Sequence, residues 1–140
     1  MQRIVVGVDG SEGAASALRW AVEEAVLRGA RVQAIQAWHI PYSDFSVYAP
    51  TLDPAVFEET AQQVLDEAVD AVDTSGLAVP VERIVRLGSA GGVLIEAAEG
   101  ADLLVVGARG LGGFAGLLLG SVSQQVAHHA PCPVVIVPAS

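Results

Sequence analysis

Short apolar runs and longer amphipathic stretches alternate along the whole chain. The apolar runs are typical of buried strands, and we expect strands at 4–8, 31–38, 81–86, 102–107 and 134–137. The amphipathic stretches have apolar residues at helical spacing, and we expect helices at 11–28, 53–76, 89–99 and 121–130. Because strands and helices follow each other throughout, the pattern predicts a parallel sheet with helices on both faces.

Capping residues mark where the helices begin. Ser11 and Ser89 each offer a side-chain oxygen to the first turn of a helix, and Asp53 does so before Pro54. In the fourth helix, Ser121 and the residue three positions later, Gln124, fit a capping box. We therefore expect Ser121 to cap that helix.

The polarity of the strands predicts their order in the sheet. The runs at 4–8 and 102–107 are apolar on both faces, which is typical of central strands. The run at 81–86 is mixed in polarity, as an edge strand would be. The order 3-2-1-4-5 with right-handed crossovers satisfies these constraints. We predict a single α/β domain over residues 1–140, built on an open, doubly wound five-stranded parallel sheet.

This order also predicts where a ligand would bind. In such a sheet the winding reverses between the first and fourth strands, and ligands bind beyond the carboxyl ends of the strands at that switch point. Asp9 follows the first strand, and Gly107 ends the fourth. We expect these two residues, distant in sequence, to lie at the same crevice.

A glycine-rich stretch connects the fourth strand to the fourth helix. Gly107 and Gly110 follow the strand, and after nine further residues Gly120 and Ser121 open the helix. Glycines at such corners can take positive φ and admit a ligand close to the backbone, where successive N–H groups form an anion-binding nest. The alternative is that these glycines serve only a tight, closely packed crossover.

A phosphate is the ligand that this arrangement favours. It would lie across Gly110 and Gly120–Ser123, where the helix start adds unpaired N–H groups and the positive end of a dipole. Arg109 and the hydroxyls of Ser121 and Ser123 are candidate donors to it. The chain contains no lysine, so the stretch is not a Walker P-loop, and no G-x-G-x-x-G follows the first strand.

Charge and composition exclude other classes of partner. The formal net charge is −9, and the seven cationic side chains are all arginines that are scattered singly. Nucleic acid is therefore not an expected partner. No apolar run approaches the roughly 20 residues that cross a membrane. The single cysteine, Cys132, fits a reducing compartment, and we expect a cytoplasmic protein.

The glycine motif and its flanks resemble the universal stress protein family, specifically its ATP-binding members. Gly107, Gly110, Gly120 and Ser121 match the family pattern G-2x-G-9x-G-(S/T). The resemblance covers the whole chain, including VVGVDGS near the start and HHAPCPVVIVP near the end.

The resemblance implies a role for each residue of the site. Adenine would lie beside Gly7, Val8 and the backbone of Ala37, and Asp9 would lie near the ribose and phosphates. Two groups of motif residues would hold the ribose and the phosphate chain of ATP, with Mg²⁺ bridging the phosphates: Val106, Gly107, Arg109 and Gly110, and then Gly120, Ser121, Val122 and Ser123.

Histidines and aromatic residues give weaker signals. His39 is either an adenine neighbour or a surface histidine, and the surface position is the expected one. His128 and His129 are adjacent in a helix, so they do not face the same way and predict no paired metal site. The loop 39–52 is long enough for a lid, and its three aromatic residues would cover the nucleotide or join a partner surface: Tyr42, Phe45 and Tyr48.

Three functions are compatible with these features. A nucleotide-binding regulatory protein is the expected one, with a protein partner that reads its nucleotide state. A slow ATP hydrolase is the second, although no lysine and no second acidic cluster near Asp9 supports turnover, and we assign no catalytic residue. The third is a nucleotide-free dimeric scaffold. The uncharged edge strand 134–137 and the resemblance both indicate a homodimer paired through that strand.

Overall fold

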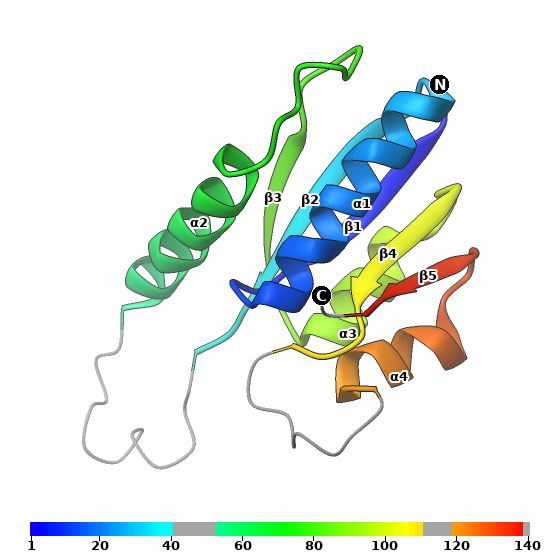
Figure 1. The fold of residues 1–140 in the computed structure, drawn as a ribbon. Coiled ribbons are helices and arrows are strands. Elements are labelled where there is room, and N and C mark those ends of the chain that lie inside the picture. Colours follow the sequence, from blue (N-terminus) through cyan, green and yellow to red (C-terminus); the bar gives the residue numbers. More distant parts are fainter. Residues whose placement is uncertain (41–52, 111–118, 139–140) are drawn as a thin grey trace.

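A computed structural model describes residues 1–40, 53–110 and 119–138, where strands and helices alternate as expected (Figure 1). The strands are β1 (Arg3–Val8), β2 (Arg31–Trp38), β3 (Glu82–Leu87), β4 (Leu103–Gly107) and β5 (Val134–Val137). The helices are α1 (Glu12–Arg28), α2 (Pro54–Asp70), α3 (Ala90–Ala97) and α4 (Ser121–His129).

The five strands form one parallel sheet in the order β3-β2-β1-β4-β5, which confirms the predicted topology. β1 lies at the centre, where Val5 pairs with Gln33 of β2 on one side and with Leu104 of β4 on the other. The winding therefore reverses between β1 and β4, and β3 and β5 are the edges.

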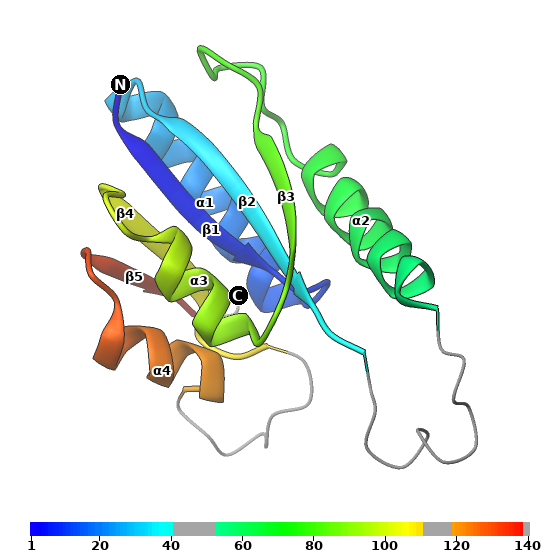
Figure 2. The same ribbon diagram turned by 180° about the vertical axis from the view of Figure 1, so that it is seen from behind.

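Helices cover both faces of the sheet, with α1 and α2 on one face and α3 and α4 on the other (Figures 1 and 2). Successive residues of β1 pack on opposite faces: Ile4 and Val6 meet the α1 and α2 side, and Val5 meets the α3 and α4 side. All three are fully buried, so β1 is apolar on both faces because both faces are covered. The described residues form one domain.

Two helices end earlier than the periodicity indicates. α2 ends at Asp70 and not at Gly76, with Ala71 as its C-cap, and the Asp73 side chain accepts a hydrogen bond from the backbone N–H of Ser75 in the turn that follows. α3 ends at Ala97, two residues before the expected position, with Ala98 as its C-cap. β3 begins and ends one residue later than expected, and β4 begins at Leu103.

Candidate functional site

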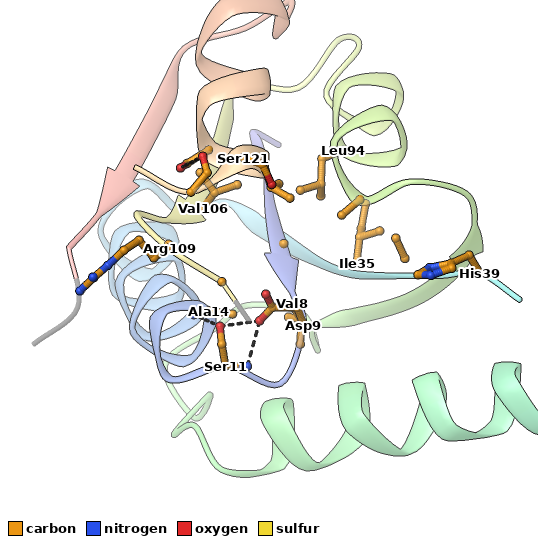
Figure 3. Close-up of a pocket in the computed structure, with 18 residues that line it drawn as sticks. Val8, Asp9, Ser11, Ala14, Ile35, His39, Leu94, Val106, Arg109 and Ser121 are labelled. Atoms are coloured by element: carbon orange, nitrogen blue, oxygen red, sulfur yellow. Dashed lines mark hydrogen bonds between the residues drawn. The ribbon is translucent and has the colours of Figure 1, made fainter. Parts of the chain in front are cut away.

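A cavity of about 510 Å³ opens beyond the carboxyl ends of β1, β2 and β4, at the predicted switch point (Figure 3). Parallel strands end at the same edge of the sheet, and the reversal of winding keeps the crossover helices from covering this edge. Residues of β1, β2, α3, β4 and the start of α4 reach the cavity together, although they are spread over most of the chain.

Every residue that the sequence predicted for the site lines this cavity. They are Gly7, Val8, Asp9, Ala37, Val106, Gly107, Arg109, Gly110, Gly120, Ser121, Val122 and Ser123. The structure thus brings together the end of β1, the end of β2 and both parts of the glycine motif.

Six further described residues line the cavity, and sequence reasoning did not assign them to it: Ser11, Ala14, Ile35, His39, Ala90 and Leu94. Alternation along β2 was a usable signal for Ile35, because it lies two positions from Ala37 in the same strand and so shares its face. His39 is exposed and reaches the cavity rim, so it is both a surface histidine and a lining residue. Tyr42, Phe45 and Tyr48 lie outside the described residues.

The Asp9 carboxylate joins the end of β1 to the start of α1. Its Oδ1 accepts hydrogen bonds from the backbone N–H of Ser11, at 2.9 Å, and from the Ser11 hydroxyl. The Ser11 oxygen in turn accepts from the N–H of Ala14, at 3.1 Å, and caps α1 as predicted. Figure 3 shows one oxygen of Asp9 on Ser11 and the other turned toward the cavity.

Lack of space, and not a positive φ, is what favours glycine at positions 107 and 110. The expectation of positive φ is wrong for Gly107, Gly110 and Gly120, because the positive-φ glycines of the described chain lie at other positions. A Cβ on Gly107 would lie 2.6 Å from the carbonyl carbon of Gly13 in α1. A Cβ on Gly110 would overlap Oδ2 of Asp9. Close packing of the crossover against α1 therefore explains why position 107 is a glycine.

Ser123 ties the two parts of the motif together. Its hydroxyl lies 2.7 Å from the carbonyl oxygen of Ala108 and 2.9 Å from that of Gly120, and it donates to this pair. The residue is only 2% exposed. In this structure the proton of the hydroxyl is directed at the backbone, and donation to a phosphate stays a prediction. The N–H of Gly120 donates to the same Ala108 oxygen, at 2.7 Å.

The start of α4 presents backbone amides to the cavity. Gly120 is the N-cap, with φ −75° and ψ 172°, so the predicted capping box at Ser121 is wrong. Gln124 instead donates from its side-chain nitrogen to the Leu119 carbonyl oxygen, at 3.1 Å. Ser121, Val122 and Ser123 form the first turn, where N–H groups have no acceptor within the helix, and all three line the cavity. This geometry suits an anion.

The other candidates contribute little chemistry. The rings of His128 and His129 lie 6.3 Å apart, tilted by 56°, and both residues are exposed. Burial raises the pKa of the Cys132 thiol, which lowers its reactivity. Across residues 1–40, 53–110 and 119–138, no three His, Cys, Asp or Glu side chains gather as metal ligands would. In the same residues no helix has the length and apolarity to span a membrane.

The fold and the cavity define an α/β protein with a small-molecule pocket at the switch point of its sheet. A family model described as "Universal stress protein family" matches residues 1–138, so the chain belongs to the universal stress protein family.

Mycobacterial relatives match almost all of this chain. Universal stress protein Rv2624c of Mycobacterium tuberculosis is 36% identical over 140 residues, which cover 97% of this chain and 48% of the relative. A universal stress protein of Mycolicibacterium smegmatis is 37% identical over 134 residues, which cover 96% of this chain and 45% of the relative. The chain thus spans about half the length of these relatives.

Solved structures share the fold. Universal stress protein UspA from Lactobacillus plantarum superposes with a TM-score of 0.82 at 22% identity, covering 97% of each chain. At that identity the likeness shows the fold alone. A universal stress protein crystallised in complex with cAMP is 33% identical, with a TM-score of 0.71, covering 99% of this chain and 98% of that one.

Proposed function

We propose that residues 1–140 form a nucleotide-binding regulatory domain that would hold ATP, together with Mg²⁺, in the cavity at the switch point. The observation that carries this proposal is that all twelve residues expected for such a site line one cavity of about 510 Å³. That volume lies within the range of roughly 300–1,000 Å³ that small-molecule sites occupy.

The lining of the cavity offers two kinds of chemistry, which suit the two parts of a nucleotide. Ile35, Ala37 and Leu94 are apolar and suit the adenine base. The first-turn amides of Ser121 to Ser123 suit phosphate oxygens. Asp9 directly follows β1 and lies beside Gly110 of the motif, where a carboxylate oxygen can accept from a ribose hydroxyl.

The relative that was crystallised with cAMP supports an adenine nucleotide as the ligand class, because it is 33% identical over nearly the whole chain. We propose regulation and not catalysis as the function of the site. Oδ1 of Asp9 accepts two hydrogen bonds from Ser11, the N-cap of α1, so this carboxylate oxygen supports the start of the helix. Mg²⁺, when bound with the nucleotide, supplies neutralisation of phosphate charge.

The proposal includes a homodimer in the cytoplasm whose surface a regulatory protein reads. β5 pairs with β4 on one side, and its residues Val134–Val137 are uncharged and half-buried in the single chain. An apolar, uncharged edge of this kind is a template for pairing with a second chain. A two-fold axis would place the two β5 strands antiparallel to each other.

Bound nucleotide can be tested directly. Protein purified without added nucleotide is denatured, and the small molecules that it releases are analysed by mass spectrometry. In a second experiment, folded protein is titrated with ATP and Mg²⁺. We expect ATP or ADP in the extract and ATP binding by calorimetry. An empty extract together with no ATP binding would favour a nucleotide-free scaffold.

A pair of variants at Gly120 tests the site itself. The nearest atom to a Cβ on Gly120 would be the Cα of Arg109, at 3.3 Å, so one methyl group needs only a small adjustment. Gly120→Val adds two further methyl groups beside the motif backbone and should abolish ATP binding, whereas Gly120→Ala should retain it. Unchanged ATP affinity in a folded Gly120→Val protein would contradict the site.

A further inference from the structure

The cationic side chains of this protein are few, and each one can be placed. The sequence has seven arginines and no lysine. Although Arg86 of β3 pairs with Ala37 of β2, which lines the cavity, six of the arginines do not line it themselves: Arg3, Arg19, Arg28, Arg31, Arg83 and Arg86. Arg3, for example, donates to the carbonyl oxygens of Ala97 and Glu99 near the start of β1, at the opposite end of the sheet from the cavity.

The segments outside the described residues add no cation. By sequence, residues 41–52 and 111–118 contain neither lysine nor arginine, and the first of them adds a carboxylate at Asp44. Among the described residues, Arg109 is therefore the one arginine or lysine that lines the cavity.

Arg109 lines the cavity through its backbone. Figure 3 shows its guanidinium directed away from the hollow, on the far side of the motif from Ile35 and Leu94. Its carbonyl oxygen faces Gly13 of α1, where a Cβ would overlap it, so the backbone of Arg109 is packed between the motif and α1.

The charge that does face the cavity is negative. One Asp9 oxygen is turned toward it, beside Gly110 of the motif. The attraction for phosphate comes from the α4 amides, whose helix-end dipole is equivalent to about half an elementary charge. Such a site holds one negative charge well, but each further phosphate charge adds repulsion from Asp9 with no additional cation to offset it.

We propose that this pocket selects nucleotides by phosphate charge. In the absence of a divalent cation it prefers an adenine nucleotide with a single negative charge, such as a cyclic phosphodiester, and it accepts a triphosphate only as the Mg²⁺ complex. This inference rests on the proposed function, since it concerns the same site. It adds the property that the ligand's charge, and not its adenine base alone, determines what is bound.

The experiment is a calorimetric titration of the whole chain with adenosine, cAMP, AMP, ADP and ATP, first in excess EDTA and then in Mg²⁺. We expect affinity in EDTA to fall from cAMP to ATP by at least about tenfold, equivalent to about 1.4 kcal/mol. Adding Mg²⁺ should restore ATP binding and leave cAMP binding nearly unchanged.

Two variants with the same change in net charge identify the cause. Asp9→Asn retains an oxygen that accepts from Ser11 but removes the charge. It should therefore lower the ratio of cAMP affinity to ATP affinity measured in EDTA. Glu23→Gln, at an exposed position on α1 that does not line the cavity, should leave the ratio as in the wild type.

The outcomes separate this inference from the proposed function. Equal affinities for cAMP and ATP in EDTA, or an unchanged ratio in Asp9→Asn, would overturn charge selection while nucleotide binding stands. No binding of any adenine nucleotide, with or without Mg²⁺, would overturn the proposed function and this inference with it.

Discussion

Gly107 and Gly110 belong to one motif, but their neighbours give them different tasks. A side chain on Gly107 would meet main-chain atoms of α1, the nearest at 2.6 Å, and a helix backbone has no room to yield. Among the described residues, a side chain on Gly110 would meet the carboxylate of Asp9, which rotates about single bonds. The first glycine therefore maintains the packing of β4 against α1, and the second maintains the position of a carboxylate at the cavity.

Alanine at each position should separate folding from binding. We expect Gly107→Ala to lower the free energy of unfolding by about 1–3 kcal/mol, the usual cost of overpacking a core contact. Gly110→Ala should leave stability within about 0.5 kcal/mol of the wild type and weaken ATP binding about tenfold, because Asp9 must move. Urea denaturation and calorimetry measure the two effects.

Gly76→Ala is a suitable control, since the Cβ there would meet only the flexible side chain of Val26, at 3.1 Å, far from the motif. Gly76→Ala should change the free energy of unfolding and the ATP affinity only slightly. Equal loss of stability in Gly107→Ala and Gly110→Ala would contradict the division of tasks between the two glycines.

Between secondary-structure elements, β3 and α2 are joined by charge as well as by packing. Arg83 of β3 donates to Asp66 of α2 at 3.0 Å and to Asp70 at 2.7 Å. The hydrogen bond from Arg83, and a second one from Gln62, hold the pKa of the Asp66 carboxyl below its ordinary value of 3.8. β3 is an edge strand, and its charged residues make it a poor template for another chain.

The depressed pKa of Asp66 predicts a pH dependence of stability. Because the folded-state pKa lies below the unfolded value of 3.8, the interaction stabilises the protein above that pH and is lost as the pH falls through the folded-state pKa. Arg83→Met removes the donor but keeps an apolar stem. We expect its melting temperature to fall less between pH 7 and pH 3 than that of the wild type.

The effect should be small, since the pair is exposed to solvent. Arg19→Met, at an exposed position on α1 where the arginine donates to Ser16 and not to a carboxylate, is the matched control for loss of one positive charge. If the melting temperature fell by the same amount between pH 7 and pH 3 in the wild type, Arg83→Met and Arg19→Met, this account would be contradicted.

For the whole molecule, the two edges of the sheet differ in what they offer another chain. β5 has no charged residue. Its backbone polar groups point alternately to β4 and to the open edge, and on the β4 side the carbonyl oxygens of Pro133 and Val137 accept from the N–H groups of Leu104 and Ala108. The N–H and C=O groups of Val134 and Ile136 therefore point to the open edge. The proposed dimer would pair through these two residues.

Proline at Ile136 tests the dimer, because it removes an outward N–H and leaves the bonds to β4 in place. We expect the wild type to sediment as a dimer at micromolar concentration and Ile136→Pro as a monomer. Ile136→Ala loses comparable side-chain bulk but retains the N–H, and should remain a dimer. A monomeric wild type, or a dimeric Ile136→Pro, would contradict pairing through β5.

The sequence alone established the order of the elements and the strand order, and it predicted twelve of the residues that line the cavity. Apolar periodicity and most helix caps are local, and one topology satisfied the polarity of the strands. All twelve residues predicted for the site do line one cavity. The twelve-residue prediction rested on motif spacing and family resemblance, which specify where residues go without specifying what each atom does there.

Contacts between distant segments determined the rest. Ser123 donates to Ala108, fifteen positions away, and so does not present its proton to the cavity. Position 107 must lack a side chain because α1 packs against it, and no property of residues 107–110 reveals this contact. The direction of Arg109 and the second oxygen of Asp9 likewise depend on neighbours brought in by the fold. Local sequence governs backbone conformation, whereas the partner of each polar atom is determined only when remote segments meet.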